Sequence, residues 1–144
     1  MKCPKCAKEL VAAERHGIQV DYCSACRGMW LDPQELDQLE DQVFSDDALK
    51  GTVVALPTPS SAVCPHCSKA LQKFKYRFYD LSLEHCEEHG FWLDAGEDLR
   101  VLELMKRSEQ NLEHKVRAEA AFAGMLQKWR TPTFLGRLRD LFSR

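Results

Sequence analysis

Eight residues of the types that bind soft metal ions fall into two groups of four. Both groups begin with a Cys-Pro-x-Cys turn and end with a second pair of ligand-type residues that are separated by two residues. The members are Cys3, Cys6, Cys23 and Cys26 in the first group and Cys64, Cys67, Cys86 and His89 in the second. This spacing lets both donor atoms of a turn point at one ion, and two such turns complete a tetrahedron. We therefore predict two metal ions per chain.

Zinc is the expected metal, although a four-thiolate site can also take iron. The chain has seven cysteines, an odd number that suits thiolate ligands plus one nitrogen better than a closed disulfide framework. His89 is the predicted eighth ligand, with His85 and His66 as rivals. A redox dithiol is the alternative reading of either group. Four candidate ligands at each site leave no open position for substrate, and no nucleophile with a base stands out, so we expect structural zinc and no enzyme activity.

The two metal-binding groups belong to a duplicated unit. Gly28-Met29-Trp30-Leu31-Asp32 recurs as Gly90-Phe91-Trp92-Leu93-Asp94. Upstream of each phrase, Ile18–Tyr22 and 73–78 alternate apolar and polar residues, which predicts short antiparallel strands. The tryptophans are expected to pack over the metal sites and shield them from water. The fold class predicted is a small metal-stabilised α+β protein with two tandem zinc ribbons and a C-terminal helical segment.

Helices are expected after each repeated phrase. Asp32, Pro33 and Glu35 form a capping-box-like start for a short helix. A second start at Asp94 precedes an apolar stripe that predicts one long helix over 95–130, or two with a break near 108–111. The stripe consists of Leu99, Leu102, Met105, Leu112, Val116, Ala123 and Leu126.

Proline and small polar residues at 56–61 are typical of a semi-extended linker. The predicted division of the chain is 1–44 for the first ribbon with its short helix, 45–62 for a linker, 63–94 for the second ribbon, and 95–144 for a long helix and a short basic amphipathic C-terminal helix.

Charge is distributed unevenly along the 144 residues. Residues 1–99 carry a net charge of −7 and residues 100–144 carry +5, within a total of −2. Thiolates bound to two divalent ions make the first part still more acidic, which disfavours phosphate binding there. No stretch reaches the roughly 18 apolar residues of a membrane-spanning helix, and cysteines serving as thiolates suit a reducing compartment. We expect a cytoplasmic protein.

The motifs Cys-Pro-x-Cys, a second ligand pair, Gly-x-Trp-Leu-Asp and a following Glu-Leu resemble the bacterial zinc-ribbon family named after the zinc finger of transcription factor B. The first copy matches from Cys3 to Leu36. The second departs by carrying His89 in place of the last cysteine and by lacking one residue before the glycine. The resemblance implies a zinc-ribbon fold and bound zinc, and it leaves the segment after residue 100 unexplained.

Two classes of function remain open. One is a non-enzymatic adaptor or regulatory protein whose ribbons bind a protein partner, with the long helix as a site of homo-oligomer formation. The other is a nucleic-acid-binding or transcription-associated factor that uses the basic tail and the series Lys73, Lys75 and Arg77, which alternates with aromatic residues. Residues 132–143 form an amphipathic segment that could dock on the chain itself, on a partner or on an anionic membrane surface.

Overall fold

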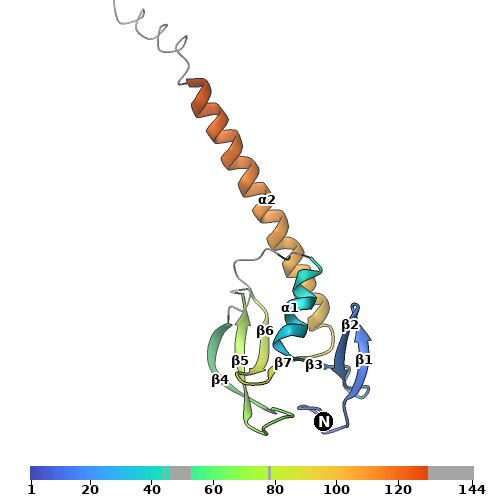
Figure 1. Cartoon of the computed structure of the whole chain (residues 1–144). Helices are drawn as coiled ribbons and strands as arrows, with labels where there is room; N and C mark the ends of the chain where they lie inside the picture. The colour runs from blue at the N-terminus through green and yellow to red at the C-terminus, as the bar shows by residue number, and fades with distance from the viewer. Residues whose placement is uncertain (44, 46–52, 78, 130–144) are drawn as a thin grey trace, which may run out of the picture. The chain divides into compact units, whose positions relative to one another are not determined.

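A computed structural model describes residues 1–43, 45, 53–77 and 79–129 (Figure 1). Residues Met1–Lys106 form one compact unit, and a second unit begins at Arg107. The structure is a small α+β protein with these elements: β1 (Val11–Arg15), β2 (Ile18–Tyr22), β3 (Met29–Leu31), α1 (Pro33–Asp41), β4 (Val53–Val63), β5 (Ala70–Tyr76), β6 (Ser82–Cys86), β7 (Gly90–Leu93) and α2 (Glu97–Trp129).

The strands of both sequence repeats form one seven-stranded sheet in the order β1-β2-β3-β7-β6-β5-β4. The repeats meet where β3 pairs antiparallel with β7, and Trp30 lies opposite Trp92 in that pair. Because these tryptophans occupy equal positions in the repeated phrase, the register places a local two-fold relation between them. The equivalent strands β2 and β6 lie outside this pair, followed by β1 and β5. The two predicted ribbons therefore share one sheet.

Glycine is required where the two repeats meet. A Cβ atom on Gly28 would lie 2.3 Å from Cζ2 of Trp92, and one on Gly90 would lie 2.3 Å from the backbone oxygen of Leu31. Gly90 also has a φ of 134°, a conformation that side chains disfavour. Both glycines of the repeated phrase thus let one repeat approach the other closely.

The sheet separates two buried clusters, because successive side chains of a strand point to opposite faces. On one face, Leu31 and Leu93 pack with residues of α1 and with Val101, Leu104 and Met105 of α2. On the other face, Trp30 and Trp92 pack with cysteines of both groups. One face is a conventional apolar core, and the other carries the candidate metal sites.

Helix α1 begins as its sequence predicts. The Asp32 side chain accepts a hydrogen bond from the Glu35 backbone, the Glu35 side chain accepts one from the Asp32 backbone, and Pro33 occupies the first turn. Leu36 and Leu39 are buried against the sheet. This capping box fixes the direction in which the chain leaves β3.

The structure differs from the predicted linker at residues 53–62, which belong to strand β4 and pair with β5. Pro57 and Pro59, together with the small polar residues around them, predicted a linker. However, β4 is the last strand of the sheet, where proline is tolerated. The register with β5 shifts on both sides of Pro59, as expected for an irregular edge strand.

Helix α2 runs without a break through 108–111, so the single-helix alternative holds. Its buried apolar residues near the start are Val101, Leu104 and Met105, whereas Leu99, which the sequence placed on the apolar stripe, is 60% exposed. No helix among the described residues is long and apolar enough to cross a membrane. The predicted C-terminal helix at 132–143 lies outside the described residues.

Candidate metal centres

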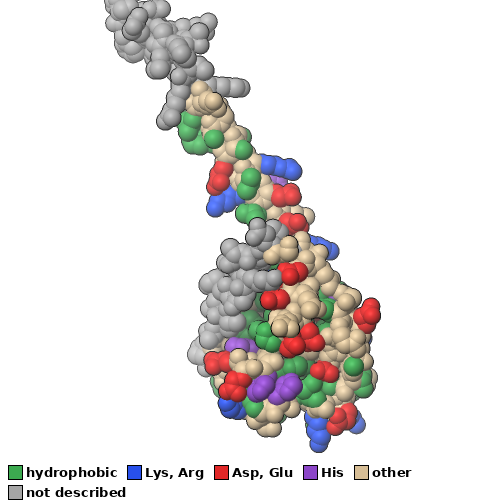
Figure 2. All heavy atoms as spheres, in the orientation of Figure 1, with side chains coloured by type: hydrophobic (Ala, Val, Ile, Leu, Met, Phe, Trp, Pro, Cys, Tyr) green, Lys and Arg blue, Asp and Glu red, His purple; other side chains and the backbone are tan. Residues whose placement is uncertain are grey.

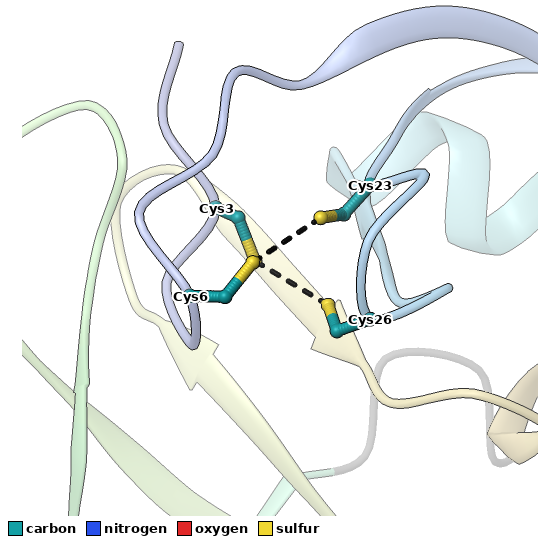
Figure 3. A group of neighbouring side chains, drawn as sticks. All are labelled: Cys3, Cys6, Cys23 and Cys26. Carbon is teal, nitrogen blue, oxygen red and sulfur yellow. Dashed lines mark hydrogen bonds between the residues drawn. The ribbon is translucent and has the colours of Figure 1, made fainter.

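The first candidate centre brings together four sulfur atoms from two loops (Figure 3). Cys3 and Cys6 precede β1, while Cys23 and Cys26 lie in the turn between β2 and β3. The Sγ atoms of Cys3 and Cys26 are 3.5 Å apart, and those of Cys6 and Cys23 are 3.4 Å apart. All four sulfurs lie within 4.8 Å of one another.

The second candidate centre gathers Cys64, Cys67, Cys86 and His89 in the same way. Nδ1 of His89 is 3.4 Å from the Cys86 sulfur and 3.7 Å from the Cys64 sulfur. The sulfurs of Cys67 and Cys86 are 3.8 Å apart. The eight residues that the sequence selected therefore form two groups, four to each.

Three of the four ligand-bearing turns share one backbone conformation. In each, the residue after the second ligand donates its N–H to the carbonyl of the first cysteine and has a positive φ; these residues are Ala7, Arg27 and Ser68. The turn from Cys86 to His89 differs, because the N–H of His89 itself donates to the Cys86 carbonyl. The residue missing before Gly90 thus shortens the turn, and the positive φ falls on the glycine.

The two rival histidines lie elsewhere. His85 is buried, with its ring stacked on Phe91 and edge-on to Phe74, and burial lowers its pKa. His66 is exposed, and its ring stacks on that of His89 at 5.0 Å between centroids. Of the three, His89 is the histidine that the structure brings among the sulfurs.

The donor sets fit zinc in both chemistry and spacing. A tetrahedral site with Zn–S bonds of about 2.3 Å has ligand atoms about 3.8 Å apart, and slightly less where one ligand is nitrogen. The observed separations of 3.4 to 3.8 Å are close to this value. They are far from the roughly 2.05 Å of a disulfide, and all seven cysteines are free thiols. Each group could hold one ion with four protein ligands.

The thiols of the two centres have unequal proton affinities. Burial raises the pKa of Cys3 to about 12 and that of Cys64 to about 11. Burial acts in the same direction on Cys23, but hydrogen bonds from the Cys26 backbone and the Cys6 thiol outweigh it and lower its pKa to about 7. Because metal ligands must be thiolates, loading these centres with zinc would release protons.

The two tryptophans pack against cysteines of both centres, as the sequence predicted. Trp30 and Trp92 are 1% and 0% exposed and belong to the buried cluster that contains Cys3, Cys23 and Cys64. Their positions in one strand pair give the two centres a common wall.

Sequence reasoning missed a charged cluster beside the first centre. Lys5 lies inside the first Cys-Pro-x-Cys turn, which we call the first knuckle. Its Nζ is 2.6 Å from Glu84 Oε2 and 3.7 Å from Asp94 Oδ2. The signal was present in the repeat, because an acidic residue stands two positions before the second ligand pair in both copies, as Asp21 and Glu84. The residues that these two carboxylates face depend on strand pairing, which the sequence does not show.

Residues 2–42 match a family model described as transcription factor zinc-finger. The match agrees with the resemblance of the first repeat to the zinc-ribbon family of transcription factor B, and it spans the first candidate centre and α1 but not the second centre. Neither the curated proteins nor the solved structures searched gave a match to the chain.

Proposed function

We propose that this protein is a non-enzymatic adaptor, in which zinc-stabilised ribbons contact a protein partner and helix α2 supports assembly. The observation that carries this proposal is a set of exposed apolar side chains on α2. Their exposed fractions run from 39% to 58%, and they are Leu112, Val116, Phe122, Met125 and Leu126. Exposed apolar patches on soluble proteins are typical of interaction sites.

The spacing of these residues supports a single contact surface. Leu112 and Val116 are separated by one helical turn, and Leu126 falls on the same side after further turns. An apolar helix side of this kind suits a second helix, either from another copy of the chain or from a partner.

Zinc has a structural role in this proposal. Cys3, Cys6, Cys23 and Cys26 would hold one ion, and Cys64, Cys67, Cys86 and His89 the other, with four protein ligands each and no free position for substrate. The ions supply stability to small units that cannot bury a large core.

The nucleic-acid alternative is weakened at strand β5. Arg77 is buried, with Nη2 2.6 Å from Glu40 Oε2, so it does not present its charge at the surface. Phe74 and Tyr76 are 1% and 2% exposed and offer no face for base stacking. Lys75 is exposed and Lys73 is half-buried, and the basic tail beyond residue 129 lies outside the described residues.

The test of the adaptor function is capture of a specific partner with matched variants. Wild-type protein loaded with zinc is compared with Leu112→Glu/Leu126→Glu and with Glu109→Gln, a control on the same helix. We expect the double variant to lose the partner or the self-association while zinc content and the ribbon fold stay unchanged. Equal recovery by all three proteins would contradict the proposed role of α2.

A salt titration separates the two function classes. Phosphate contacts give an affinity that falls steeply with salt, with a slope close to the number of contacts. We expect no saturable binding of duplex DNA or single-stranded RNA at about 150 mM salt. Tight binding with a steep slope, lost in Lys73→Ala/Lys75→Ala, would replace the adaptor proposal with the nucleic-acid one.

A further inference from the structure

An acidic cradle in the second repeat holds a lysine from the first. The side chain of Lys5 is 31% exposed and pairs with Glu84 at 2.6 Å and with Asp94 at 3.7 Å. Glu97 adds a further electrostatic attraction for Lys5. We call Lys5, Glu84, Asp94, Glu97 and the adjoining Trp92 the Lys5 cradle.

The first repeat carries the same acidic arrangement at equivalent positions. Asp21 lies opposite Trp30 in the β2–β3 pair, as Glu84 lies opposite Trp92 in the β6–β7 pair. Asp32 and Glu35 follow Trp30 at the positions that Asp94 and Glu97 hold after Trp92. These residues line a pocket of about 510 Å³.

The residue that fills the cradle is replaced in this pocket. The second knuckle, Cys64-Pro65-His66-Cys67, has histidine where the first knuckle has Lys5. His66 lines the pocket, and its ring lies against those of Trp30 and His89. We call Asp21, Trp30, Asp32, Glu35 and His66 the His66 pocket. Figure 2 shows histidine side chains at the surface with acidic side chains on the same face.

A buried donor in the His66 pocket lacks the partner that its counterpart has. In the Lys5 cradle, Trp92 Nε1 donates to Asp94 Oδ1 at 2.7 Å while Oδ2 of the same carboxylate faces Lys5. In the pocket, Asp32 Oδ1 accepts instead from the Glu35 backbone. Trp30 is 1% exposed, and its Nε1 has no hydrogen-bond partner among the described residues. A buried donor without a hydrogen-bond partner costs free energy. A ligand that let Trp30 Nε1 form a hydrogen bond would remove this cost.

The carboxylates of the pocket also lack a cation. The ion pairs found among the described residues include none with Asp21, Asp32 or Glu35. Burial and then repulsion from Asp32 and Asp21 raise the pKa of Glu35, against the hydrogen bond from the Asp32 backbone. Glu88, at the rim, already pairs with Lys69 at 2.7 Å. The pocket thus has the negative charge of the cradle without its ammonium group.

We propose that the His66 pocket binds a lysine side chain of a partner protein in the way that the Lys5 cradle holds Lys5. Entry of the ammonium group gives Asp32 the arrangement of Asp94, with one oxygen toward the ammonium and the other accepting the Trp30 indole N–H. A metal ion is a poorer occupant, because the metal-ligand clusters of the described residues do not include these carboxylates. This inference rests on the proposed adaptor function and names the chemistry of the partner.

The test uses the full-length zinc-loaded protein and a blocked tripeptide, acetyl-Gly-Lys-Gly-amide, followed by NMR at the indole N–H of Trp30. The matched probes carry norleucine or arginine in place of lysine. We expect the lysine peptide alone to move the Trp30 resonance downfield and saturably, while the already bonded Trp92 resonance stays in place.

Asp21→Asn leaves the α1 cap intact and should weaken binding about two- to fivefold, as for a partly exposed charge pair. Glu14→Gln, an exposed control on β1, should have no effect.

The decisive variant is His66→Lys, which gives the pocket its own lysine. We expect it to keep two zinc ions, to shift Trp30 without peptide and to abolish the lysine response. An equal response to norleucine, stronger binding of the arginine peptide, or an unchanged lysine response in His66→Lys would each overturn the proposal. If His66→Lys still captures the protein partner of the wild type, the adaptor function stands and only this pocket is refuted.

Discussion

The two repeats use one scaffold in different ways. Each supplies three strands, a tryptophan and four metal-ligand residues on either side of the β3–β7 pair. In the second repeat, β4 covers β5, and Ser60 of β4 donates to Glu84 beneath Lys5. In the first repeat, β1 is the other edge of the sheet and has no such cover.

The same acidic arrangement is filled in the second repeat and open in the first. The first knuckle contributes Lys5 to the second repeat, whereas the second knuckle contributes His66 to the first. The difference between lysine at position 5 and histidine at position 66 therefore decides whether the site holds an internal ion pair or remains a candidate binding pocket.

The largest effect we expect comes from removing one ligand of the second metal centre while the first centre stays intact. His89→Ala should lose one of two zinc ions, because a structural zinc contributes on the order of 10 kcal/mol and three ligands hold it much less tightly. His85→Ala should keep both ions, since His85 packs between Phe74 and Phe91. Elemental analysis with a chromophoric chelator measures the count. Retention of two tightly bound ions by His89→Ala would show that the second centre does not use this histidine.

A second contrast is between Arg77, after β5, and Arg15, at the end of β1. Arg77 is buried against Glu40, which also accepts a hydrogen bond from Tyr76 at 2.5 Å. Arg77→Met would leave the Glu40 carboxylate buried without its cation and should cost about 3–5 kcal/mol. Arg15 lies over the Tyr22 ring at 4.1 Å at the sheet edge, so Arg15→Met should cost about 0.5–1 kcal/mol. Urea unfolding in excess zinc compares them, and equal losses would contradict the buried ion pair.

Local chemistry was predictable from the sequence, and long-range pairing was not. The capping box at Asp32, the packing of Trp30 against the cysteines and the clustering of the eight ligand-type residues follow from short-range spacing. Whether those ligands bind zinc stays a prediction. Strand β4 was missed because Pro57 and Pro59 break a strand only where both edges are paired.

The surface expected on β5 shows the same limit. The series Lys73, Lys75 and Arg77 looked like one basic face, but Arg77 follows the last residue of β5 and turns into the core to meet Glu40 from α1. A partner 37 positions away in sequence cannot be inferred from an alternating pattern. The joining of both repeats into one sheet was missed for the same reason, because nothing local in the repeated phrase indicates that β3 pairs with β7.

The third prediction tests how closely the repeats meet. Gly28→Ala places a methyl group against the Trp92 ring and should cost about 1–3 kcal/mol through overpacking. Gly90→Ala should cost more, because its Cβ meets the Leu31 backbone, which cannot rotate away, and its φ is positive. Gly17→Ala is the control: its φ is also positive, but nothing lies within 4 Å, so it should cost about 1–2 kcal/mol. Thermal unfolding measures these losses of stability. A smaller loss for Gly90→Ala than for Gly17→Ala would contradict the close approach of Gly90 to the Leu31 backbone.

The smallest effect concerns the equivalent glutamates Glu97 and Glu35. Burial, followed by repulsion from Asp94 and Glu84, raises the pKa of Glu97 to about 7, against the hydrogen bond from the Asp94 backbone and the attraction of Lys5. A carboxyl whose folded pKa exceeds its unfolded value of about 4.5 binds more protons in the folded state, so its contribution to stability falls as the pH rises from about 4.5 to 7. Because Glu97 is only partly buried, solvent screening reduces this contribution to about 1 kcal/mol.

Glu97→Gln should therefore flatten the pH dependence of unfolding in this window and raise stability slightly at pH 7.5. The measurement is the difference between wild type and variant in excess zinc at each pH, because protonation of the metal ligands affects both proteins alike. Glu35→Gln is the matched variant in the first repeat, where the pKa is also raised but no lysine is nearby among the described residues. If Glu97→Gln follows the wild-type curve in parallel from pH 4.5 to 7, the carboxyl of Glu97 titrates as an ordinary exposed group, and the acidic crowding around Lys5 is weaker than the structure indicates.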